Sequence, residues 1–284
     1  MERDGRPFSI SLVLGAVLSV QIGAAVATTL FDQLGPAGTV FLRILFSALV
    51  LVAIWRPAAA ALRCAGRREI VIFGLVLAGM NLSFYEALDR IPLGVAVTLE
   101  FVGPLGVAIA SSRRRLDLAW AALAVLGIVL LSPLPGGSLD ALGIGFALLA
   151  GGFWAAYIVL AARVGALLPG GAGLALAMCI GAVALVPFGI AGGGAALADP
   201  ALLAGGFAVA MLSSAIPYSL ELEALRRLPQ GVFGVLMSLE PAVAAAVGFV
   251  LLGQGLLVRE LIAIGLVVAA SAGALRSAPP AVEA

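Results

Sequence analysis

The feature that most constrains this sequence is a series of long apolar runs separated by short polar or turn-forming breaks. The runs cover residues 8–30, 36–55, 70–88, 92–111, 117–133, 139–162, 172–190, 200–222, 230–252 and 257–275. A helix needs about 20 mostly apolar residues to cross the hydrocarbon core of a bilayer. Only 11% of the residues are charged, against about 25% in a typical soluble domain. The pattern predicts an all-α integral membrane protein with ten transmembrane helices.

All 16 basic residues are arginines, and their distribution predicts the orientation of the chain. If the amino terminus is cytoplasmic, thirteen arginines fall on the inner side, and Arg90 and Arg259 fall on the outer side. Basic residues accumulate in the cytoplasmic loops of membrane proteins. We therefore expect a multi-pass protein of the bacterial cytoplasmic (inner) membrane with both termini in the cytoplasm.

The chain also contains an internal repeat. Residues 86–94 (EALDRIPLG) and 223–231 (EALRRLPQG) agree at six of nine positions with an offset of 137, which also maps Pro104 onto Pro241. Two five-helix repeats are predicted, over residues 1–135 and 136–284. Because five is odd, the second repeat must be inserted upside down. Inverted repeats typically place a binding site near the bilayer midplane and support alternating access.

Three charged residues within the predicted spans are candidates for function: Arg43, Glu100 and Glu240. Other acidic residues start a span or stand four residues before an arginine, as do Glu69, Asp117, Asp140, Asp199, Glu86 and Glu223. A charge at the centre of a span costs about 2.5–3.5 kcal/mol, so such residues usually face a cavity or a partner. The alternative is a structural Arg–Glu pair that holds helices together.

Pro104 and Pro241 closely follow the two glutamates and are predicted helix breaks. A proline removes a backbone hydrogen bond and frees a carbonyl group, although an ordinary kink is the alternative. Burial disfavours a carboxylate anion, whereas a nearby arginine or bound ammonium group favours it. Because the chain has no lysine or histidine, Glu100 and Glu240 are the candidates for proton coupling.

Polar and aromatic side chains of other spans are candidates to complete a pocket. They are Gln21, Asn81, Tyr85, Trp154, Tyr157, Ser213, Ser214, Tyr218 and Ser238. Inside membrane bundles such groups more often bond to neighbouring helices, which is the alternative for each.

The residue types that are missing exclude several functions. Without histidine, and with two cysteines in different segments (Cys64 and Cys179), the sequence predicts no metal site and no disulfide framework. It contains no nucleophile–base pair and no phosphate-binding loop, so we expect neither an enzyme nor a cofactor. A net charge of +1 does not indicate a nucleic-acid partner.

Several stretches resemble a known transporter family. The most specific are residues 92–104 (PLGVAVTLEFVGP) and 237–242 (MSLEPA), and weaker ones are 19–21, 80–85, 111–114, 154–158 and 216–221. They resemble the drug/metabolite transporter superfamily of the EamA-domain type, and within it the threonine/homoserine exporter branch. The resemblance implies ten spans, two five-helix repeats, cytoplasmic termini and export of small amino acids such as threonine and homoserine.

For such a substrate, Arg43 can bind the carboxylate, and Glu100 or Glu240 the ammonium group. The substrate hydroxyl would find partners such as Asn81, Tyr157 or Ser214. An aromatic or sulfur amino acid, a purine and a drug-like cation are alternative solutes. A membrane enzyme and a purely structural membrane protein are the alternatives from other classes. We expect the chain to work as a monomer or a homodimer.

Overall fold

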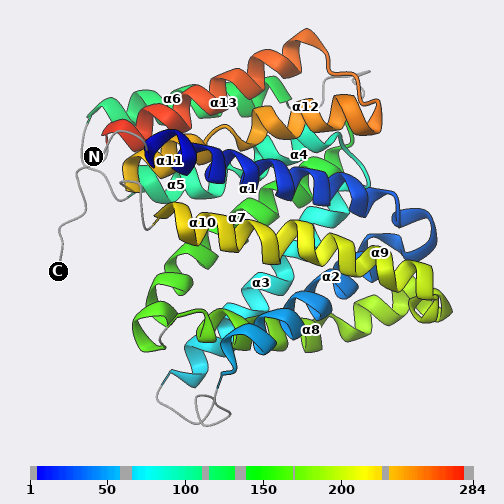
Figure 1. Ribbon diagram of the computed structural model, residues 1–284. Coiled ribbons are helices and arrows are strands. Elements are labelled where there is room, and N and C mark those ends of the chain that lie inside the picture. Colours follow the sequence, from blue (N-terminus) through cyan, green and yellow to red (C-terminus); the bar gives the residue numbers. More distant parts are fainter. Residues whose placement is uncertain are drawn as a thin grey trace.

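The computed structural model describes residues 5–57, 66–110, 115–131, 139–168, 170–225 and 230–277, and all regular secondary structure in these ranges is helical (Figure 1). The α-helices are α1 (Gly5–Thr28), α2 (Phe31–Trp55), α3 (Arg67–Leu88), α4 (Leu93–Glu100), α5 (Val102–Ala110), α6 (Arg115–Leu131), α7 (Ala141–Leu167), α8 (Ala172–Gly193), α9 (Pro200–Ala210), α10 (Ile216–Leu225), α11 (Gln230–Met237), α12 (Glu240–Leu252) and α13 (Val258–Ser277). The 3₁₀ helix η2 (Gly194–Ala198) precedes α9, and the π-helical turn η3 (Met211–Ala215) joins α9 to α10.

Within the described residues, six helices are long and apolar enough to cross a membrane. They span Phe8–Thr28, Phe31–Trp55, Arg67–Leu88, Ala141–Leu167, Ala172–Ala198 and Val235–Leu252. Shorter apolar helices cover Leu93–Val107, Ala119–Leu130 and Pro200–Ala215. The prediction of a helical membrane protein is therefore confirmed.

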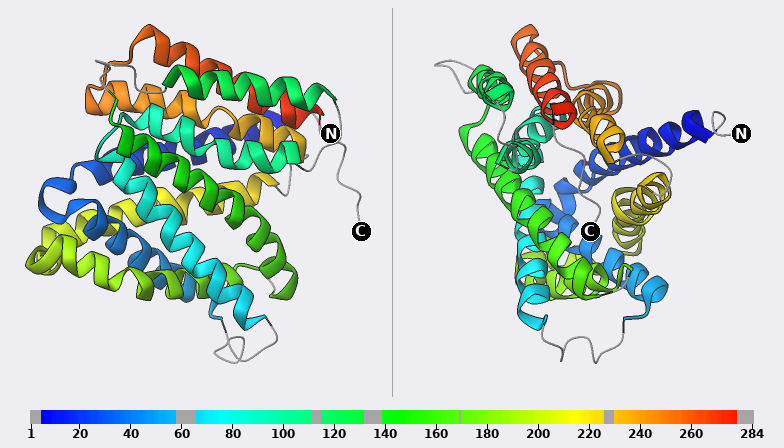
Figure 2. Two further views of the ribbon diagram at one scale, coloured as in Figure 1. Left: turned by 180° about the vertical axis from the view of Figure 1, so that it is seen from behind. Right: turned by 90° about the vertical axis from the view of Figure 1, so that its left-hand side faces the viewer.

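The helices pack in two groups that share a central region. In one group α2 packs against α8, and α3 packs against both α7 and α8; in the other α13 packs against α6 and α12. The groups lie at opposite ends of the molecule as seen in Figures 1 and 2. Between them α1 contacts η3, α10 and α12, while α4 contacts α7 and α12. Helices from both halves of the chain therefore surround the same interior.

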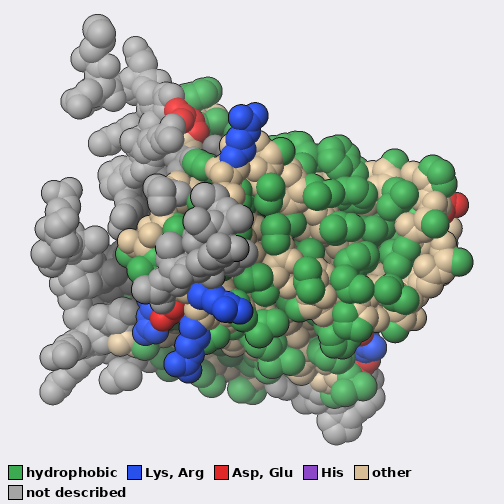
Figure 3. All heavy atoms as spheres, turned by 90° about the horizontal axis from the view of Figure 1, so that it is seen from below, with side chains coloured by type: hydrophobic (Ala, Val, Ile, Leu, Met, Phe, Trp, Pro, Cys, Tyr) green, Lys and Arg blue, Asp and Glu red, His purple; other side chains and the backbone are tan. Residues whose placement is uncertain are grey.

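The outer surface is suited to lipid. On the face seen in Figure 3, hydrophobic side chains form a broad belt, and the charged side chains gather towards its edges. Among the described residues, several large apolar side chains are strongly exposed, for example Val183 at 72% and Val250 at 73%. Such exposure would be unfavourable in water, whereas a bilayer solvates it.

Three of the acidic residues predicted at helix ends make stabilising contacts there. Asp140 accepts a hydrogen bond from the Leu142 N–H at 2.8 Å. Asp199 caps α9 in the same way. Arg90 pairs with Glu86 at 2.8 Å, four residues apart on α3 and its end. The side chain of Asp117, as well as Arg227 and Cys64, lies outside the described residues.

Candidate functional site

A small polar cavity lies inside the bundle, where helices of both halves meet. Its volume is about 270 Å³, near the lower limit of about 300 Å³ for ligand pockets. It is lined by Val20, Gln21, Ala24, Arg43, Met80, Asn81, Phe84, Val97, Glu100, Trp154, Tyr157, Ser213, Glu221, Met237 and Glu240. A cavity of this size suits a small solute.

Two of the acidic residues stand where helices are interrupted. Glu100 is the last residue of α4, and Glu240 is the first residue of α12, one turn after α11 ends. They are 9% and 6% exposed, respectively, and both border the cavity. Carboxyl groups that are removed from bulk solvent yet face a cavity are suited to binding a cation or a proton.

The local sequence explains the interruption after Glu100. Pro104 has no N–H to donate to the Glu100 carbonyl four residues earlier. That carbonyl instead faces α7, where a side chain on Gly151 would place its Cβ 2.7 Å from the Glu100 oxygen. A side chain on Gly103 would likewise overlap the Gly151 carbonyl. Two glycines therefore let α7 approach the broken segment closely. In α12, Pro241 occupies the first turn, where a missing N–H costs little.

Arg43 projects from the middle of α2 to the cavity. Its Nη1 donates to the Tyr85 hydroxyl and its Nη2 to the Ser213 carbonyl, both at 3.4 Å, and its guanidinium lies 5.5 Å from the centre of the Tyr85 ring. Its Nε has no hydrogen-bond partner among the described residues. Arg43 also forms no ion pair with a described carboxylate. The guanidinium therefore retains donors for a ligand, unlike an arginine in a structural Arg–Glu pair.

Eight of the residues predicted for the site line the cavity: Gln21, Arg43, Asn81, Glu100, Trp154, Tyr157, Ser213 and Glu240. Three others, Tyr85, Ser214 and Ser238, are not part of the described lining. Tyr85 is fully buried and contacts Arg43. Ser214 is also fully buried and is not part of the lining. The side chain of Tyr218 lies outside the described residues.

Several lining contacts restrict how the cavity can be used. Asn81 donates its amide to the Leu77 carbonyl at 2.9 Å within its own helix, which commits one of its donors. Trp154 packs edge-on against Phe101 with ring centres 5.5 Å apart, and Tyr157 packs against Phe73 at 5.1 Å. Both aromatic side chains therefore pack against a neighbouring ring where they line the cavity.

Glu221 is a charged lining residue that the sequence analysis did not predict for the site. It is half-buried on α10 and brings a third carboxyl group to the cavity. The sequence did contain a sign of its role, because Glu221 lies within an apolar run. It neither starts that run nor stands four residues before an arginine. The described lining thus combines three carboxyl groups with one guanidinium.

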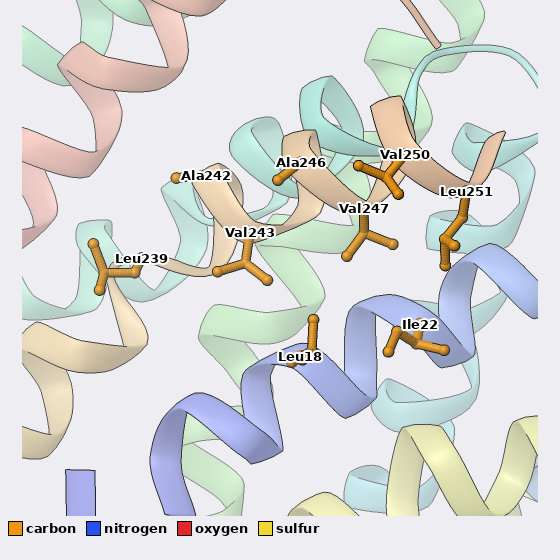
Figure 4. A pocket seen from close by; sticks show the side chains of 9 residues that line it. All are labelled: Leu18, Ile22, Leu239, Ala242, Val243, Ala246, Val247, Val250 and Leu251. Carbon is orange, nitrogen blue, oxygen red and sulfur yellow. The ribbon is translucent and has the colours of Figure 1, made fainter. Parts of the chain in front are cut away.

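A second hollow is apolar throughout and lies between α1 and α12. Its volume is about 480 Å³, and its lining comprises Leu18, Ile22, Leu239, Ala242, Val243, Ala246, Val247, Val250 and Leu251 (Figure 4). In Figure 4 Val243, Val247 and Leu251 of α12 lie on the side of this helix that faces Leu18 and Ile22 of α1. With no polar side chain in its lining, the groove offers nothing to bind a zwitterion.

The fold and the polar cavity define the class as a polytopic helical membrane protein built like a solute transporter. The sequence model of the EamA-like transporter family matches residues 141–276. Threonine/homoserine exporter RhtA of Escherichia coli (strain K12) and of Salmonella typhimurium (strain LT2) are each 43% identical over 266 residues. Each match covers 93% of this chain and 90% of the relative. The chain belongs to the EamA-like transporter family, and the resemblance noted in the sequence is confirmed.

A solved crystal structure of low sequence similarity supports the fold alone. It is 19% identical, covers 94% of this chain and 96% of its own, and superposes with a TM-score of 0.64. The helical arrangement described above therefore also occurs in an experimentally determined protein.

Proposed function

We propose that this protein is an inner-membrane exporter of small amino acids such as threonine and homoserine, driven by proton entry through alternating access. The observation that carries the proposal is 43% identity over 93% of the chain to proteins named threonine/homoserine exporters. A small polar cavity with groups of both charges inside the bundle supports it independently.

The cavity supports recognition of a zwitterion. Arg43 lines the cavity and makes only long hydrogen bonds to neutral acceptors, so the remaining donors of its Nη1 and Nη2 can bind the substrate carboxylate. Glu100, Glu221 and Glu240 are available for the ammonium group. Eight residues predicted from the sequence meet here, which favours a binding role for the set over separate helix-bonding roles.

The proposed architecture is ten transmembrane helices in two inverted five-helix repeats, residues 1–135 and 136–284. Both bounds of α11 lie 137 residues after those of α4, the offset of the sequence repeat. Packing also recurs in related pairs: α3 contacts α7 and α8, while α10 contacts α1 and α9 contacts α2. Likewise α5 contacts α7 and α12 contacts α1. This pattern supports a pseudo-two-fold axis through the cavity.

The proposed orientation places both termini in the cytoplasm. The excess of arginines on one set of loops supports it. In Figure 1 the first residues of α1 and the last residues of α13 lie at the same end of the bundle. An even number of spans requires this, so the arrangement also supports the proposed orientation.

Proton entry is proposed as the energy source. Three carboxyl groups share the cavity with one guanidinium, so a proton or a substrate ammonium group reduces their mutual repulsion. Competition between the two cations for the same carboxylates couples proton entry to substrate exit. Each proton that enters gains about 2.3 kcal/mol per 100 mV, enough for roughly a 40-fold gradient of solute.

Counterflow of labelled homoserine in proteoliposomes tests the proposed function. We expect saturable uptake that threonine blocks and an aromatic amino acid does not, and Glu100→Gln should abolish it. Folded protein that shows no counterflow would remove the substrate assignment and leave the fold and the family unchanged.

A drug-like cation is a second candidate solute, favoured by the excess of carboxyl groups in the cavity. Export of a cation should depend on the glutamates and not on Arg43, whereas export of a zwitterion should depend on both. Transport of the lipophilic cation tetraphenylphosphonium by wild type and Arg43→Gln, measured beside homoserine, separates the two candidates.

A further inference from the structure

The π-helical turn η3 brings an irregular piece of backbone to the cavity. It spans Met211–Ala215 between α9 and α10. Turns of this kind inside longer helices are frequent at functional sites. Other helices supply donors to its carbonyl groups, since Ser19 Oγ donates to the Leu212 carbonyl at 2.7 Å and Arg43 Nη2 donates to the Ser213 carbonyl at 3.4 Å. The turn is therefore anchored by α1 and α2.

Ser213 is the residue of this turn that borders the cavity. It is 3% exposed, and its hydroxyl has no hydrogen-bond partner in the part of the chain that the structure describes. A buried hydroxyl without a partner costs about 1–3 kcal/mol. A side chain on Gly23 of α1 would overlap the Ser213 hydroxyl, so glycine at this position leaves it room. This hydroxyl needs a partner that the described protein does not provide.

Ser214 offers an internal comparison. It belongs to the same turn, is fully buried, and its hydroxyl also has no partner among the described residues. Unlike Ser213, it is absent from the cavity lining. The Ser213 hydroxyl lies against Gly23, but because Ser213 borders the cavity, rotation about its Cα–Cβ bond can turn this hydroxyl toward a solute there. Ser214 can affect binding only through the shape of the turn.

We propose that Ser213 recognises the side-chain hydroxyl of the transported amino acid and so makes the exporter selective for hydroxy amino acids. The inference rests on the proposed function. Arg43, which would bind the substrate carboxylate, donates to the carbonyl of the same residue. The carboxylate anchor and the hydroxyl partner are thus adjacent. Threonine and homoserine carry a hydroxyl on Cβ and Cγ, respectively, a short distance from the carboxylate.

A substrate without the hydroxyl should bind less well for a physical reason. When such an analogue occupies the cavity, it excludes water and leaves the Ser213 hydroxyl unpartnered. Sites that hydrogen-bond a substrate hydroxyl discriminate more strongly than apolar pockets do. Selectivity would then arise from one side chain on the π-helical turn.

Competition for labelled-homoserine uptake in proteoliposomes tests the inference. The competitors are threonine and 2-aminobutyrate, which is the deoxy analogue of both threonine and homoserine. Ser213→Ala should weaken threonine inhibition roughly 3- to 10-fold, the effect of one hydrogen bond, and leave 2-aminobutyrate inhibition within about twofold. Ser214→Ala, the matched control, should leave the ratio of the two inhibition constants unchanged.

The remaining outcomes are distinguishable. An equal loss for both competitors would mean that Ser213 binds the common carboxylate or shapes the turn, and it would overturn the inference. Wild-type protein that does not distinguish the competitors would do the same while leaving the proposed function intact. Wild-type protein that transports neither hydroxy amino acid would overturn both. If Ser213→Ala does not fold, Ser213→Cys, a near-isosteric weak donor, should lose the same selectivity.

Discussion

Replacing Arg43 by glutamine should weaken binding of homoserine much more than it weakens the fold. The guanidinium makes two hydrogen bonds, each 3.4 Å long, to the Tyr85 hydroxyl and the Ser213 carbonyl. Both exceed the usual range of about 2.7–3.2 Å for strong bonds. Together with the contact to the Tyr85 ring at 5.5 Å, they should stabilise the fold by about 1–2 kcal/mol.

The expected loss in binding is larger, because a bound carboxylate would accept charge-assisted hydrogen bonds. Such a bond contributes about 1.5–3 kcal/mol, so the dissociation constant of homoserine should rise roughly 10- to 150-fold in Arg43→Gln. Arg43→Lys keeps the charge without the planar fork of donors, and it should fall between the variant and wild type.

Titration of the purified protein with homoserine and with homoserine amide measures this effect. The amide lacks the negative charge, so its affinity should be nearly the same in wild type and Arg43→Gln. Thermal unfolding of the same samples reports the change in stability. If Arg43→Gln binds homoserine within about twofold of wild type while remaining folded, Arg43 does not anchor the carboxylate.

Further predictions concern the acidic residues, a close helix contact and a helix cap. Glu100→Gln or Glu240→Gln should abolish the increase in homoserine export that an inward proton gradient produces in proteoliposomes, and an unchanged response in both variants would contradict proton coupling. Gly151→Ala places a Cβ 2.7 Å from the Glu100 carbonyl oxygen, so it should lower the unfolding free energy by about 1–3 kcal/mol. Gly152→Ala is the control, because the space around Gly152 is open, and it should leave the unfolding free energy unchanged. Asp199→Ala removes two hydrogen bonds at the start of α9 and should cost about 1 kcal/mol in chemical unfolding, while Asp199→Asn should retain most of the cap.

Much of the candidate site could be predicted from the sequence, because a charge inside an apolar run is unusual. Arg43, Glu100 and Glu240 stand out for this reason, and all three line the cavity. The sequence does not tell which of the neighbouring polar residues line the cavity. Ser213 and Ser214 are adjacent and chemically identical, and the direction in which each points depends on the π-helical turn, which periodicity at 3.6 residues per turn does not anticipate.

In the fold, too, some features follow from the hydrophobic pattern of the sequence, and others depend on packing between distant segments. Apolar runs of about 20 residues predict helices because the requirement acts on each segment alone. Pro104 predicts the break in the run 92–111, because it offers no N–H to the Glu100 carbonyl. The close approach of α7 to that carbonyl depends on packing instead. Contacts between distant segments, such as Gly103 with Gly151, leave no local trace in the chain.

Three irregular segments of backbone meet at the polar cavity: the breaks after Glu100 and before Glu240, and the turn η3. Non-helical backbone is tolerated at membrane depth only where protein or a polar cavity surrounds it. Ser19 and Arg43 supply donors to the carbonyls of η3, and Pro104 leaves the Glu100 carbonyl without its helical partner. Such segments have fewer hydrogen bonds to lose when helices shift. If the protein works by the proposed alternating access, rearrangement should therefore start at these segments, which border the proposed substrate site, rather than in the regular helices.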